Sequence, residues 1–330
     1  MSAARASLAL GAAALLAACA GAGAEAGTGA GDVREAAVEA AVEARGPGPE
    51  TISLLDQPLY APPVPEADRA SLEARLTETH AAHLARPDDV EALIVHARVL
   101  GQAGRFREAV AVFSDGLRMH PDDAHLYRFR GHRFITLRQF DLAVEDLTRA
   151  SQLVFWQPDE VEPGLKPNAR GIDLDTLQEN IWYHLALAHY LQGNYARAYA
   201  AQVECMKVST NDDSIVATSD WMWMTLMRLN RKADAAKVLG RITPSMDILE
   251  NQAYHRRLLM YKGLEKPEAL LDTSNPDPTQ IATQGYGVAN YYVVTGDTAR
   301  ARQVFDRILA GTGWNAFGYI AAEADVQRLK

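Results

Sequence analysis

The chain has 330 residues, of which 48% are hydrophobic, so it can bury a sizeable core as one long solenoid or two ordinary domains. Its formal net charge of −9 disfavours nucleic-acid binding, because contacts with phosphates supply most of that affinity. Two cysteines, Cys19 and Cys205, are too few for a disulfide framework. Cys205 lies at a small-residue position of a predicted helix, where we expect a buried, unreactive thiol.

The first residues have the features of an export signal. Arg5 precedes an apolar run over residues 6–18, which is too short to cross a bilayer as a helix and ends in small residues. We therefore predict a signal peptide over residues 1–18. The sequence Leu16-Ala17-Ala18-Cys19 resembles the bacterial lipobox, which implies lipidation of Cys19; ordinary cleavage at a nearby Ala-x-Ala-type site is the alternative. With Ala20 in place of an aspartate, the resemblance implies export to the periplasm and sorting to the outer membrane.

Residues 19–67 are predicted to be a flexible tether. Residues 20–50 are rich in alanine, glycine and glutamate, and a proline-rich run follows over residues 60–65. We expect this run to be extended, either as a spacer or docked in an aromatic groove. No later stretch is apolar over 18 residues, so the predicted contact with a membrane is the N-terminal lipid anchor alone.

From residue 90 onward, the pattern of a helical hairpin occurs twice, 34 residues apart. The first copy contains Leu93, Ala97, Leu100, Gly104, Phe106, Ala109, Phe113, Gly116 and Pro121, and the second contains Tyr127, Gly131, Phe134, Phe140, Ala143, Leu147 and Ala150. Small residues let two helices approach closely, and large residues fill the grooves between them. The period and the alternation resemble the tetratricopeptide repeat.

The resemblance covers residues 68–330 and implies an all-α, right-handed α-solenoid. Alanines of the second helix mark about six hairpins, at Ala109, Ala143, Ala198, Ala235, Ala269 and Ala301. The fourth and fifth hairpins match weakly and are placed mainly by phase. Helices predicted over residues 68–85 and 315–329 suit the two ends as caps, because terminal repeats need a polar outer face.

An insertion separates the second and third hairpins, over residues 155–176. Pro158, Pro163 and Pro167 exclude a continuous helix there. Insertions in repeat arrays map to loops on one face, which is often the binding face. A loop without a binding role is the alternative.

The resemblance also implies a concave groove that binds a peptide or protein segment. The groove positions of the first helices fall on Arg98, His125, Arg128, His132, Asn180, Tyr183, Tyr190, Arg228, Tyr254, Tyr261, Tyr286 and Asn290. Arg98, Arg128 and His132 form a local positive site that suits a carboxylate such as a peptide C-terminus. The tyrosines offer amphipathic contact area. In the structural alternative, the arginines pair with acids of neighbouring helices and the tyrosines are half in the core.

Two further features have a structural and an interface interpretation. Arg130 stands where the family has leucine, and Asp141 or Glu145 is the predicted partner that neutralises it, since a buried charge needs one. Arg256 and Arg257 raise the same question. The apolar run over residues 221–224 (Trp-Met-Trp-Met) favours core packing, and an adaptable interface patch is the alternative.

No catalytic, cofactor or metal site is predicted. His80 and His83 share one helix face, but no third ligand stands near them, and no HExxH, CxxC or nucleotide-binding pattern occurs. The leading hypothesis is a non-enzymatic adaptor in the bacterial cell envelope. The first alternative is a structural component that forms homodimers through the Trp-Met run or a cap, and the second is an enzyme with a site distributed over several repeats.

Overall fold

The computed structural model describes residues 48–165, 167–271 and 277–329. The predicted signal peptide, Cys19 and the tether up to residue 47 lie outside them. Apart from two short strands, all regular elements of the described residues are helices. In chain order its elements are β1 (Thr51–Ile52), β2 (Pro58–Leu59), α3 (Glu66–Ala85), α4 (Val90–Gln102), α5 (Phe106–Met119), α6 (Ala124–Thr136), α7 (Phe140–Val154), α8 (Leu177–Leu191), α9 (Tyr195–Val208), α10 (Asp212–Arg228), α11 (Lys232–Gly240), α12 (Gln252–Tyr261), α13 (Pro267–Leu270), α14 (Pro278–Thr295), α15 (Thr298–Leu309) and α16 (Phe317–Arg328).

Helices α4 to α15 pack as six consecutive pairs, each joined by a short turn. The predicted all-α solenoid of six hairpins with a helix at each end is confirmed. Four of the marker alanines of the second helices are completely buried: Ala109, Ala143, Ala198 and Ala301. The marker of the fifth hairpin is wrong, because α13 is a single turn in which Ala269 is exposed and Leu270 is buried.

Small residues place the helices of each pair in close contact. A Cβ atom added to Gly116 would lie 2.7 Å from the Leu93 side chain, and one added to Gly131 would lie 2.8 Å from Leu147. Side-chain caps fix where the first helices begin; Asp89, for example, accepts a hydrogen bond from the Ala92 amide at the start of α4. The large-small alternation in the sequence therefore encodes the packing inside each hairpin.

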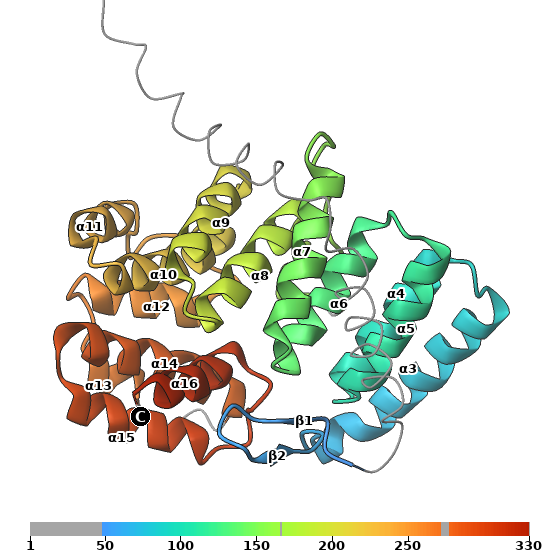
Figure 1. Cartoon of the computed structure of the whole chain (residues 1–330), viewed down its shortest axis with the longest axis horizontal. Helices are drawn as coiled ribbons and strands as arrows, with labels where there is room; N and C mark the ends of the chain where they lie inside the picture. Colours follow the sequence, from blue (N-terminus) through green and yellow to red (C-terminus); the bar gives the residue numbers. More distant parts are fainter. Residues whose placement is uncertain (1–47, 166, 272–276, 330) are drawn as a thin grey trace, which may run out of the picture.

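The hairpins follow an arc that brings the C-terminal helices back toward the middle of the array (Figure 1). Helix α16 contacts α8 as well as its neighbours α14 and α15. Arg138, in the turn after α6, pairs with Glu323 of α16 at 2.9 Å, and the two side chains are 3% and 1% exposed. Arg328 donates a hydrogen bond to the Leu191 carbonyl at the end of α8. The array therefore closes on itself, whereas the sequence led us to expect an open groove.

Residues 48–67 differ from the predicted tether. Strands β1 and β2 form a small antiparallel hairpin that lies between α3 and the C-terminal helices (Figure 1). Four hydrogen bonds within the described residues join this segment to the array: the Arg107 amide donates to Glu50 (2.9 Å), Thr51 donates to the Leu137 carbonyl (2.7 Å), the Leu54 amide donates to Glu323 (3.3 Å), and Trp314 donates to the Tyr60 carbonyl (2.7 Å). Residues 48–67 are therefore fixed on α5, the turn after α6 and the C-terminal part of the array, whereas the sequence predicted a flexible tether up to residue 67.

The two end helices differ in burial. Helix α3 has no buried residue, as expected of a cap. In α16, residues 318–326 are all buried, so the prediction of a second solvent-facing cap is wrong. The apolar residues of α16 face α14, α15 and α8, and its acids are paired with arginines. Helix α16 thus fills part of the inner face of the array.

The Trp-Met run lies in the core of α10, where none of its four side chains is more than 7% exposed. This confirms core packing and removes one of the two surfaces, the Trp-Met run and a cap, that were expected to mediate the alternative of homodimerisation. Cys205 is also completely buried, as predicted, and burial raises the pKa of its thiol to about 12. Within the described ranges, no helix is long and apolar enough to cross a membrane.

Candidate functional site

None of the twelve predicted groove residues is exposed. Five are buried: Arg128, Tyr190, Tyr261, Tyr286 and Asn290. Seven are partly buried: Arg98, His125, His132, Asn180, Tyr183, Arg228 and Tyr254. They separate into a network rich in hydroxyl groups in the C-terminal half and a basic cluster in the N-terminal half.

The C-terminal network joins α8, α10 and α14 to α16. The hydroxyl groups of Tyr190 and Tyr286 share a hydrogen bond of 2.8 Å, and Tyr286 donates to Asp325 at 3.0 Å. Arg228 donates to Asn290 at 2.7 Å and pairs with Asp325 at 2.5 Å. The partner-binding role predicted for these residues is therefore corrected: in this structure their partner is α16.

The remaining tyrosines pack with the tryptophans of α10. Tyr183 shares a hydrogen bond of 3.0 Å with Tyr254 and accepts one of 2.9 Å from Trp221. The Tyr261 ring stacks on Trp223 with 3.8 Å between their centroids. These contacts match the half-core alternative, so the aromatic groove surface is not formed.

The arginines found at apolar positions form structural ion pairs. Arg130 donates to the two carboxylate oxygens of Asp146 at 2.7 and 2.8 Å. Both side chains are buried, as is the neighbouring Ser114. The ion pair is as predicted, but Asp146 takes the role expected of Asp141 or Glu145. The other two pairs are Arg256 with Glu265 at 2.9 Å and Arg257 with Asp220 at 2.7 Å.

The basic cluster consists of Arg98, Arg128, His132, Arg133 and His184, from helices α4, α6 and α8. The guanidinium groups of Arg98 and Arg128 lie 4.8 and 4.4 Å from the centroid of the Phe129 ring. The rings of His132 and His184 lie 4.4 Å apart. The structure thus brings together the three basic residues predicted from the sequence and adds two others.

Burial and mutual repulsion set the charges in this cluster. Burial lowers the pKa of His132 well below its ordinary value, and Arg133 and His184 lower it further. Burial, with Arg128, also lowers the pKa of His184 well below its ordinary value. Burial and the charges of Arg128 and Arg98 lower the pKa of Arg133 to about 9. At pH 7 the two imidazoles are therefore neutral and the three guanidinium groups carry the positive charge.

Three acids near the cluster, Glu162, Asp175 and Glu91, interact with this charge, but among the described residues only Glu162 forms an ion pair with one of the three arginines. Arg128 pairs with Glu162 of the insertion at 2.7 Å, and both side chains are almost completely buried. Arg98 and Arg133 have no ion-pair partner within the described part of the chain. A carboxylate that entered here would meet guanidinium groups held in place by the helices, which is the arrangement that binds anions well.

Two predicted residues lie at the edge of the basic cluster. Asn180 donates a hydrogen bond of 3.1 Å to Glu162. His125 lies 3.8 Å from Asp123 and 3.8 Å from Glu160. Both side chains therefore contact acids of the insertion, at the edge of the basic cluster.

The sequence analysis missed Arg133, His184 and Glu162. A signal for Arg133 was present, because α6 carries four basic residues within six positions, from Arg128 to Arg133. His184 lies beside a predicted groove position on α8. No pattern in the sequence distinguishes Glu162 from the other acids of the insertion.

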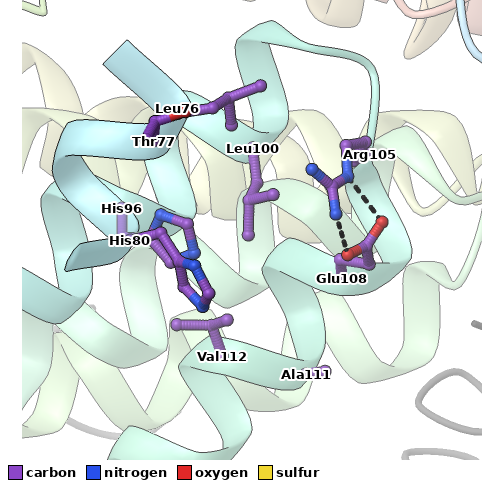
Figure 2. Close-up of a pocket in the computed structure, with 9 residues that line it drawn as sticks. All are labelled: Leu76, Thr77, His80, His96, Leu100, Arg105, Glu108, Ala111 and Val112. Atoms are coloured by element: carbon purple, nitrogen blue, oxygen red, sulfur yellow. Dashed lines mark hydrogen bonds and ion pairs between the residues drawn. The ribbon is translucent and has the colours of Figure 1, made fainter. Parts of the chain in front are cut away.

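A second recess lies at the N-terminal end, between α3, α4 and α5 (Figure 2). It has a volume of about 320 Å³, and the rings of His80 and His96 stack in it with 5.1 Å between centroids. His83 also stacks on His96, at 5.8 Å. Arg105 is neutralised by Glu108 across the recess (Figure 2). Rings stacked face to face do not converge on a metal ion, and no group of three suitable ligands occurs among the described residues.

No protein-family model and no curated protein sequence matches the chain. Solved structures with some similarity include the MamA protein (12% identity, TM-score 0.41, covering 61% of this chain and 90% of that one). They also include YrrB, described as a TPR protein with an unusual peptide-binding site (11%, 0.38, 70% and 91%), and the TPR domain of P58(IPK) (12%, 0.24, 74% and 80%). At these TM-scores the similarity carries no functional argument, and the repeat architecture stands on the helical pairs of the chain itself.

Proposed function

We propose that the protein is a non-enzymatic scaffold that holds a protein or peptide partner, and that Arg98, Arg128 and Arg133 bind a carboxylate of this partner. The proposal depends on one observation, the close approach of three arginines of which only Arg128 forms an ion pair within the described residues. The chain as a whole has a formal net charge of −9, yet two of these arginines lack an ion pair within the described residues. An anion would relieve their repulsion.

The stacked hairpins give the proposal its general basis. Arrays of helical repeats present extended surfaces on a rigid frame, and binding of other proteins is their common use. In this chain α16 occupies the C-terminal half of the inner face, and its Phe317 ring also lies 5.3 Å from the His132 ring of the basic cluster. The partner segment is therefore proposed to meet the cluster on the side of its arginines. The partner carboxylate can come from a peptide C-terminus or from an acidic side chain.

We also propose that the scaffold is exported and anchored to a membrane through Cys19. The support is the apolar leader and the four-residue lipobox-like sequence. Labelling of growing cells with an alkyne-bearing palmitate tests this anchor, because the label should appear in the wild-type protein and be absent from a Cys19→Ser variant. Equal labelling of the two proteins would disprove it.

The carboxylate site is tested with an array of nine-residue peptides that have free C-termini. Each peptide that binds is made again with an amidated C-terminus, and both forms are titrated by fluorescence anisotropy. A charge-assisted hydrogen bond contributes about 1.5–3 kcal/mol, so the free form should bind at least about tenfold more tightly. Equal affinities of the two forms would refute recognition of a terminal carboxylate.

The variants Arg98→Gln and Arg133→Gln should each weaken binding about tenfold, because they remove donors of the site. Neither variant leaves an acid without its ion-pair partner within the described residues, so both should keep the fold. Arg302→Gln is the matched control, since Arg302 is 58% exposed on α15. Should the control lose as much affinity as the two variants, the effect is one of net charge and the assignment is wrong.

A further inference from the structure

The insertion carries an acid into the basic cluster. Its backbone is held by a bridge between Val161 and Thr176, and the Glu162 amide donates a hydrogen bond of 3.0 Å to the Asp175 carbonyl. The Leu177 amide donates to the Glu160 carbonyl at 2.9 Å. These bonds fix the segment so that the Glu162 side chain reaches α6 and α8 and occupies the position that a ligand carboxylate would take.

The contacts of Glu162 are those of an incomplete ligand. Its Oε1 atom pairs with Arg128 at 2.7 Å and accepts a hydrogen bond from Asn180 at 3.1 Å. Its Oε2 atom and the Nε atom of Arg128 are buried without hydrogen-bond partners. A buried carboxylate oxygen without a donor raises the free energy of this arrangement, because its lost bonds with water are not replaced. A carboxylate free to adopt the bidentate geometry that guanidinium groups favour would bind better than Glu162 does.

The segment around Glu162 is also weakly held. Val161 and Ile172 are 58% and 47% exposed, so they contribute little to the core. The contacts of the insertion with the loop before α12 are exposed as well: an ion pair between Arg170 and Asp247, of a kind that contributes little to stability, and a hydrogen bond that Asn168 donates to Glu250. Segments with few buried apolar contacts open locally at a low free energy.

We propose that Glu162 is an intramolecular competitor for the carboxylate site: it occupies Arg128 in the free protein and gives way to the carboxylate of the partner. This inference rests on the proposed function, since it concerns the same site. Competition lowers the apparent affinity by the fraction of molecules in which the site is free, so the partner binds tightly only when it also holds the displaced segment away.

The first test compares Glu162→Gln with wild type in binding the free-carboxylate nonapeptide selected above, at 0.15 M salt. The variant should bind at least about tenfold more tightly, because its amide is a weaker competitor for Arg128. Glu160→Gln is the matched control: it removes the same charge two residues away, from a side chain that is 62% exposed, and should change the affinity less than twofold. Affinity of Glu162→Gln equal to or below that of wild type would overturn the inference.

The second test uses the wild-type protein and does not depend on how a variant folds. Hydrogen exchange of the Glu162 and Leu177 amides, measured by NMR, should accelerate at least about fivefold when the nonapeptide is bound, because the bonds that hold the segment must open. Exchange that is unchanged or slower would refute displacement. If no free-carboxylate peptide binds wild type or Glu162→Gln, the proposed function fails and this inference fails with it. If the peptide binds both equally, the function stands and only the competition is refuted.

Discussion

The closure of the array depends on Glu323, whose replacement gives the sharpest test of the fold. Arg138 donates to this carboxylate at 3.0 and 2.9 Å, and to the carbonyl oxygens of Thr136 and Trp314 at 2.6 and 2.8 Å. Glu323 also accepts a hydrogen bond from the Leu54 amide at 3.3 Å. One buried carboxylate thus ties together α16, the turn after α6 and the N-terminal hairpin.

The variant Glu323→Leu should lower the free energy of unfolding by about 3 kcal/mol. Removing one partner of a buried ion pair costs about 3–5 kcal/mol, because the other charge stays buried without compensation. The two carbonyl acceptors that remain for Arg138 place the expected loss at the lower end. The double variant Arg138→Met/Glu323→Leu leaves no unpaired charge and should lose less than about half as much.

The loss is measured by urea unfolding, followed both by far-UV circular dichroism and by tryptophan fluorescence. Trp314 reports locally, since its ring lies 5.3 Å from the Arg138 guanidinium group. Asp306→Ala is the control: its pair with Arg302 is more than half exposed and should contribute at most about 1 kcal/mol. A loss below about 1 kcal/mol for Glu323→Leu, or an equal loss for the single and double variants, would show that this pair does not hold the array closed.

Two further predictions concern buried side chains. Burial, with the charges of His80 and His83, lowers the pKa of His96 to about 4, so the unfolded chain takes up a proton that the folded chain does not. The free energy of unfolding should therefore fall as the pH drops from about 6.5 to about 4, and His96→Phe should lessen this fall in urea titrations across that range. Burial raises the pKa of Cys205 to about 12. In a Cys19→Ser variant at pH 8, a chromogenic disulfide reagent should therefore label this thiol at least about 100-fold more slowly than in 8 M urea, and equally fast labelling would show that the thiol is accessible.

The hairpins could be predicted because their packing is local. Leu93 contacts Gly116 in the next helix, and Leu147 contacts Gly131 in the preceding one, so each pairing appears in the sequence within one repeat. The same reasoning placed the groove positions on the inner side of the first helices. That placement was sound for Arg98 and Arg128, which the structure brings together around Phe129.

The closure could not be predicted, because it depends on contacts between residues far apart. Arg138 and Glu323 are separated by 185 positions, and no spacing in the sequence relates them. The curvature that joins them is the sum of the small rotations of each hairpin relative to the one before it. The short α13 and the insertion change that sum. The sequence therefore assigns Tyr190 and Tyr286 to a partner, although their hydrogen bonds lead to Asp325 of α16.

The two halves of the inner face differ in how firmly the chain itself occupies them. In the C-terminal half, Asp325 has three partners, Tyr286, Arg228 and Arg328, and residues 318–326 of its helix are buried. A competing ligand would have to break these bonds and expose a whole helix. In the N-terminal half, displacing Glu162 breaks one ion pair, one hydrogen bond with a side chain and the backbone hydrogen bonds of the Glu162 and Leu177 amides, and it does not expose a whole helix. Of these two halves, the basic cluster is the one where a partner has fewer bonds to displace, which is why the binding experiments are directed there.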